Sequence, residues 1–155
     1  MATIVRAEAP LTARWATSFW LLAVGAGVAE TVVHVAGAIG DGVGLPALVG
    51  QIAVRAVIYG ALLVVIDRYF RRGVAWARYL LAGVLGTVGL ASLIYEPIAW
   101  LSRNDPTALD WSAEFLTSAT LRTIHLSALL AALILSFRPG TNTWFKPRTV
   151  RQQQH

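Results

Sequence analysis

The chain contains no cysteine, one lysine and few charged side chains of any kind. Without cysteine it can form no disulfide bond, no thiolate metal site and no thiol nucleophile. Only 14% of its residues are charged and 56% are hydrophobic, whereas soluble domains carry about a quarter charged residues. A surface of this composition is too apolar for water, which argues against an ordinary soluble domain.

The hydrophobic residues gather in four runs, at 15–39, 45–66, 74–100 and 111–137. A helix needs about 20 apolar residues to cross the bilayer core, and each run reaches that length. The strands of a membrane barrel would instead alternate polar and apolar residues, and these runs do not. We therefore predict an all-α fold, an integral membrane four-helix bundle spanning residues 15–137.

The first run has a second interpretation, as a cleaved signal peptide. Arg6 and Arg14 precede it, and Gly27 and Ala29 are small enough for a cleavage site. The apolar stretch nevertheless continues to Ile39, and its positive leading segment is unusually long. A retained transmembrane helix is therefore the preferred interpretation.

Basic residues predict the orientation of the four helices. Ten of them lie in the segment 1–14, in the stretch 68–78 that ends in the first turns of the third run, or in the segment 138–155, and only Arg103 lies on the opposite side. Basic residues favour the cytoplasmic side, so we expect a multi-pass protein of the cell membrane with both termini cytoplasmic. The positive charge then needs no nucleic acid as a partner. Twelve arginines to one lysine are typical of a high-GC bacterial genome, which indicates a bacterial inner membrane.

The ends of the runs carry residues suited to helix boundaries. Indole rings favour the membrane interface, and tryptophans lie near run ends at Trp15, Trp20, Trp76, Trp100 and Trp111. Residues 40–46 read as a short turn with Pro46 in the first turn of the next helix, and Asp110 or Ser112 can cap the last one. The basic tail 138–155 shows no apolar period, and its Trp144–Phe145 pair either rests on the membrane surface or belongs to a disordered tail.

Polar side chains inside the apolar runs are the candidate site. Counted from the outer boundary, Glu30 lies about 14 Å deep, Arg55 about 15 Å and Arg122 about 16 Å, close to the middle of a core about 30 Å thick. Because polar stripes are costly in lipid, they should face inward, and Glu30 can then bridge to either arginine. His34 and Gln51 would form a second layer. The predicted ligand or structural charge cluster comprises Glu30, His34, Gln51, Arg55, Arg122 and His125.

This cluster supports two functional interpretations. In the preferred one it is structural, its hydrogen bonds fix how the helices align, and the protein is an accessory or scaffold subunit of a membrane assembly. In the other, Arg55 and Arg122 hold an anionic group in a polar cavity while Glu30 or His34 exchanges protons, as in a small carrier or an anion- or lipid-binding protein. The expected partners are the lipid bilayer and a membrane protein or a second copy of the chain.

Small residues predict close helix packing. Gly27 lies on the same face of the first helix as Glu30, and the third run has a small-residue face that lets backbones approach. The predicted packing positions are Gly27, Ala82, Gly86 and Gly89.

Enzymatic chemistry is not expected. Ser118, His125 and Glu114 are the residue types of a hydrolase, but they lie on one helix over nearly three turns, so the imidazole cannot both reach the serine and be oriented by the carboxylate. A zinc site at Glu30 and His34 lacks a clear third ligand. His34 and His125 differ by about 13 Å in predicted depth, too much for a shared haem. We therefore predict no enzyme, no cofactor and no metal site.

The segment after the last helix, "SFRPGTNTWFKPR" at residues 136–148, resembles the tail of small four-helix actinobacterial membrane proteins of unknown function. The resemblance covers mainly the third and fourth runs and the tail, has no specific motif, and implies a four-helix membrane fold without an activity.

Overall fold

The computed structural model describes residues 8–103 and 111–145 as a set of helices. Two of the long segments contain a π-helical stretch in which the backbone continues without a break. In chain order the elements are α1 (Leu11–Gly40), α2 (Leu45–Val64) with its π-helical end η1 (Val65–Phe70), α3 (Ala75–Gly83), the π-helix η2 (Val84–Gly89), α4 (Leu90–Arg103), α5 (Ala113–Ser136) and α6 (Pro139–Trp144).

Four of the segments are long and apolar enough to span a membrane: Leu11–Gly40, Leu45–Phe70, Ala75–Arg103 and Phe115–Ser136. This confirms the predicted helical fold, and each of the four segments overlaps one of the predicted runs. The first helix begins at Leu11 instead of residue 15, and the second continues to Phe70 instead of residue 66. Residues 8–103 and 111–145 contain no β-strand.

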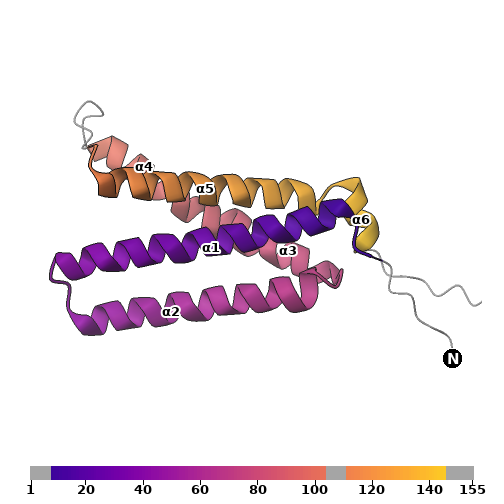
Figure 1. Ribbon diagram of the computed structural model, residues 1–155, viewed down its shortest axis with the longest axis horizontal. Helices are drawn as coiled ribbons and strands as arrows, with labels where there is room; N and C mark the ends of the chain where they lie inside the picture. Colours follow the sequence, from indigo (N-terminus) through magenta and orange to yellow (C-terminus); the bar gives the residue numbers. More distant parts are fainter. Residues whose placement is uncertain (1–7, 104–110, 146–155) are drawn as a thin grey trace, which may run out of the picture.

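α1 is the central helix of the arrangement (Figure 1). It lies between α2 on one side and α5 on the other, and the segment formed by α3, η2 and α4 crosses obliquely behind it. The most extensive packing joins α1 and α5, whereas α2 packs mainly along α1. α2 is therefore the least covered of the long helices.

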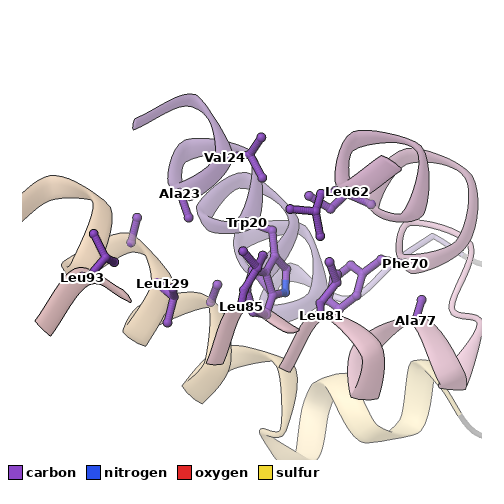
Figure 2. Close-up of a cluster of buried hydrophobic side chains, with 14 of the residues drawn as sticks. Trp20, Ala23, Val24, Leu62, Phe70, Ala77, Leu81, Leu85, Leu93 and Leu129 are labelled. Atoms are coloured by element: carbon purple, nitrogen blue, oxygen red, sulfur yellow. The ribbon is translucent and has the colours of Figure 1, made fainter. Parts of the chain in front are cut away.

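The hydrophobic core surrounds Trp20 of α1 (Figure 2). Its indole is fully buried, with Leu81, Leu85 and Phe70 around it. The indole N–H donates to the hydroxyl of Ser136 at 3.0 Å, so the one polar group of this side chain is satisfied inside the core. Trp20 lies about 13 Å from the first residue of α1 and inside the protein core, not near the end of the helix as the sequence predicts, because α1 starts earlier than expected.

The core fills only one half of the molecule, the half nearest the start of α1. This arginine-rich end carries Arg14, Arg68, Arg71, Arg72, Arg78 and Arg138. No residue of α1 beyond Thr31 is buried, and buried residues of α5, among those described, begin at His125. The only buried residues of α2 are Leu48 and Leu62. In the other half, the four long helices leave most of their apolar side chains uncovered.

The helix boundaries follow the predicted turn chemistry. Gly42 adopts a φ of 74° between α1 and α2, a conformation that suits glycine, and Pro46 lies in the first turn of α2. Ser112 caps α5 by accepting a hydrogen bond from the backbone N–H of Phe115 at 3.3 Å. The alternative cap, Asp110, lies outside the described residues.

The start of the predicted tail is folded back onto the helices. Residues Pro139–Trp144 form α6, which packs against α1 and α5. Thr141 is fully buried, and the ring of Phe145 lies 5.1 Å from that of Phe70. Neither interpretation of the tail, a surface-resting or a disordered segment, describes residues 139–145. The residues after Phe145 lie outside the described part of the chain.

Candidate functional site

Halfway along the bundle, Glu30 of α1 faces His125 of α5. Glu30 Oε1 and His125 Nδ1 are 3.5 Å apart, and the two side chains are 20% and 11% exposed. Neither atom has a hydrogen-bond partner with good geometry among the described residues. The contact joins the two most extensively packed helices, and it becomes an ion pair when the imidazole is protonated.

A second polar group links α1 to α2. Arg55 Nη1 donates to Thr31 Oγ1 at 3.0 Å. The Thr31 hydroxyl itself donates to the carbonyl oxygen of Gly27 at 2.8 Å, and the Tyr59 hydroxyl donates to the same carbonyl at 3.0 Å. The two hydroxyl oxygens lie 3.3 Å apart. Within the described residues, all hydrogen bonds between α1 and α2 therefore lie at one turn of α1, at Gly27 and Thr31.

Gly27 brings the two polar groups together. A Cβ at this position would lie 3.1 Å from His125 Cε1 and 3.1 Å from the Tyr59 hydroxyl. Only a residue without a side chain lets α5 and α2 approach α1 this closely from both sides. The bundle is consequently closed at this level by direct contact between three helices.

The structure gives Glu30 a different neighbour from the predicted arginines. Within residues 8–103 and 111–145, its ion-pair contact is with His125, and Arg55 turns to Thr31 instead. Arg122 is half-buried one turn before His125 on α5. The predicted depths place Arg122 level with Glu30. In the structure α5 is shifted along α1 by about one helical turn, roughly 5 Å, so His125 lies beside Glu30 instead.

The predicted second layer, His34 and Gln51, lies in the loosely packed half. His34 is exposed on α1 and Gln51 is half-buried on α2. Neither side chain makes a hydrogen bond to any part of the chain that the structure describes. The structure therefore does not join these two residues to the Glu30–His125 contact.

The predicted packing positions on the third segment lie along α5. A Cβ on Gly86 would be 3.2 Å from the Leu133 side chain, and one on Gly89 would be 3.8 Å from that of Leu129. Ala82 is half-buried. Both glycines belong to η2, in which the wider π-helical turn changes the direction of later side chains relative to a continuous α-helix.

Sequence reasoning missed Thr31 and Tyr59. The signal was present, because Tyr59 follows Arg55 by four residues and so shares its helix face, and Thr31 adjoins Glu30. Hydroxyl side chains inside an apolar run commonly bond to another helix or to their own backbone, and here they do both.

The described residues contain no group of three or more His, Asp or Glu side chains placed to hold a metal ion. The side chain of Glu114 lies outside the described part. Chemically, the site offers a cationic polar patch: the guanidinium of Arg55, with one N–H bonded to Thr31, together with the carboxylate of Glu30 and the imidazole of His125.

No protein-family model, no curated protein and no solved structure matches the chain.

Proposed function

We propose that the chain is a multi-pass membrane protein that serves as an accessory or scaffold subunit and not as an enzyme. Its α2 would dock against a transmembrane helix of another protein, with Arg55 facing an aspartate or glutamate on that helix. The observation that carries the proposal is that Arg55 is half-buried in the middle of an apolar helix and makes a single hydrogen bond to the part of the chain that the structure describes.

Arg55 is too deep to place its charge in water. It lies ten residues after Leu45, about 15 Å along the helix axis, and a guanidinium near the centre of a bilayer costs about 2.5–3.5 kcal/mol on insertion scales. Its bond to Thr31 engages one of five N–H donors. A carboxylate on a neighbouring helix would accept two more in a bidentate pair, which offsets the cost of the buried charge.

The poor coverage of α2 supports the same proposal. Val54 and Val57, on either side of Arg55, are 60% and 71% exposed, and Gln51 adds a second half-buried polar group one turn away. An apolar helix face with an arginine at mid-depth and a glutamine one turn away fits another transmembrane helix, because pure lipid offers no acceptor to either group.

The carrier interpretation has less support from the geometry. In it Arg55 and Arg122 hold an anion while Glu30 or His34 exchanges protons, but Arg55 donates to Thr31 and Glu30 lies against His125. At Gly27 the three helices touch, so a solute would have to displace side chains to pass that level. An anion bound between Arg55 and Arg122 is the alternative outcome of the experiment below.

Charge distribution supports the topology that we propose. Apart from Arg55 and Arg122 in the middle of their helices, the described arginines gather at the end of the bundle where α1 begins and α6 packs, and Arg103 alone lies at the other end of a long helix. By the positive-inside rule the arginine-rich end faces the cytoplasm, and both chain termini lie on that side of the cell membrane.

The test is native mass spectrometry of the protein extracted in polymer discs from its own membrane. Wild type should carry a membrane protein in fixed stoichiometry, and Arg55→Met should lose it while keeping the same thermal transition within a few degrees. Arg72→Met, which removes an exposed charge at the arginine-rich end, should retain it. Replacing the partner's intramembrane carboxylate by its amide should release wild type as well.

Three results would overturn the proposal. These are a wild-type chain that carries no protein, an assembly that survives Arg55→Met, and a partner without an intramembrane carboxylate. A lone chain with a bound anion that Arg55→Met removes would establish the carrier interpretation instead.

A further inference from the structure

A pocket of about 600 Å³ lies at the arginine-rich end, far from Arg55 along the helices. It is a partly open pocket lined by the residues just before α1, by the first turns of α1, by the end of η1 and by the end of α6. Binding sites for small molecules commonly have volumes of about 300–1,000 Å³. The lining residues that matter to the argument are Arg14, Thr17, Leu21, Phe70, Arg71 and Trp144.

Two guanidinium groups from different segments share this pocket. Arg14 makes no ion pair or hydrogen bond through its side chain within the described residues. Arg71 contacts Asp67 through Nη1 alone at 2.5 Å, and its side chain is 60% exposed, so its other N–H donors stay accessible. Glu8 also lines the pocket. With Asp67 paired to Arg71, an anion would be held by Arg14 and by the N–H donors that Arg71 does not use for Asp67.

The pocket is lined by charged side chains at one end and by apolar side chains further along the helix axis. Leu21 follows Arg14 by seven residues, about 10 Å further into the bundle, and the buried Phe70 contributes an apolar wall. Between them, the Thr17 and Ser18 hydroxyls donate to the backbone carbonyls of Ala13 and Arg14. Hydroxyls whose protons are engaged in this way can face a hydrocarbon chain at little cost.

We propose that this pocket binds a phosphate ester, and specifically the headgroup of an anionic glycerophospholipid. Arg14 and Arg71 would hold the phosphate oxygens, and an acyl chain would run past Leu21 toward the bundle. Charged and apolar walls in this order match a molecule that is anionic at one end and hydrocarbon at the other. The proposal rests on the topology proposed above, in which this end of the bundle lies at a membrane surface.

The experiment compares two double variants of equal charge in phosphatidylcholine nanodiscs. Arg14→Gln with Arg71→Gln changes the pocket. Arg68→Gln with Arg72→Gln removes two exposed arginines of the same end that do not line it. Titration with phosphatidylglycerol, followed by native mass spectrometry, should show one tightly held lipid on wild type. The pocket variant should bind it at least about tenfold more weakly, and the control should stay within about twofold of wild type.

Soluble competitors distinguish a lipid from a free anion. Glycerol 3-phosphate and inorganic phosphate at millimolar concentration should leave the bound lipid in place, because they lack the acyl chain. Displacement by either would assign the site to a soluble phosphate and overturn the lipid proposal. Equal losses in the two double variants would also overturn it, since attraction would then be a general effect of positive charge.

This result is separable from that of the accessory function. Neither Arg14 nor Arg71 lies on α2 beside Arg55, so the pocket variant should retain the membrane partner. If lipid binding depends on the pocket but wild type carries no partner, only the accessory proposal fails. If the partner is present and the pocket variant binds the lipid as tightly as wild type, only the lipid proposal fails.

Discussion

At the scale of single residues, two glycines of α1 separated by one position have opposite surroundings. A Cβ on Gly27 would meet His125 and Tyr59 at 3.1 Å, whereas a Cβ on Gly25 would meet nothing within 4 Å. The pair therefore separates the effect of a side chain in the helix contact from the effect of alanine on the helix itself.

We expect Gly27→Ala to destabilise the protein by about 1–3 kcal/mol, the usual cost of overpacking. Gly25→Ala should instead be neutral or stabilising by up to about 1 kcal/mol, because alanine favours the helix over glycine. Unfolding by sodium dodecyl sulfate in mixed micelles measures both. Equal effects of the two substitutions would show that α1, α2 and α5 do not meet at Gly27.

The charged residues and the histidine of the site could be found from the sequence, but not their pairing, nor the hydroxyls of Thr31 and Tyr59. An acid, an imidazole and two guanidiniums in apolar runs were visible as isolated exceptions. The neighbour of Glu30 depends on how far α5 slides along α1, and one helical turn, about 5 Å, exchanges Arg122 for His125. Composition does not determine that offset, because it depends on side-chain packing around Gly27 and on the tilt of the helices.

At the scale of elements, α6 closes the arginine-rich end through aromatic packing. Phe145 is 4% exposed and contacts Phe70, and the guanidinium of Arg78 lies 5.3 Å from its ring. The turn before α3 adapts to this contact, since Gly73 has a φ of 75° and a Cβ there would lie 2.8 Å from Trp144. Six residues of helix would not be stable without such packing.

We expect Phe145→Ala to cost about 3 kcal/mol, within the range for a buried phenylalanine, and to increase the rate of chymotryptic cleavage after Trp144, the last residue of α6. Phe115→Ala is the matched control, because Phe115 is 38% exposed at the other end of α5; it should cost less than about 1 kcal/mol and leave the cleavage rate unchanged. A cleavage rate unaffected by Phe145→Ala would contradict the docking of α6.

The long elements were predictable and the short one was not. Each membrane-length run gives its own signal through about 20 apolar residues. The segment 139–144 is less than two turns long, too short to show the 3.6-residue period, and its buried residues include Thr141. The π-helical stretches could not be predicted either, because a local widening of the helix leaves the apolar character of a run unchanged.

At the scale of the whole molecule, the bundle is packed at its arginine-rich half and open at the other. The Gly27 level marks the boundary, with the Trp20 core on one side and the exposed His34 on the other. In the open half most apolar side chains are uncovered, and within residues 8–103 and 111–145 Arg55 makes one hydrogen bond. The accessory proposal accounts for both features by placing another protein against α2.

The most direct test uses the absence of cysteine, which lets one introduced cysteine carry a photocrosslinker such as benzophenone maleimide in native membranes. Ile52→Cys places it on α2 one turn from Arg55, and Val88→Cys places it on the exposed side of η2 as the control. We expect illumination to join Ile52→Cys to a protein of one defined mass, and Arg55→Met in the same chain to abolish that product. Val88→Cys should not give it. The same product from both sites, or from Ile52→Cys with Arg55→Met, would contradict docking through α2.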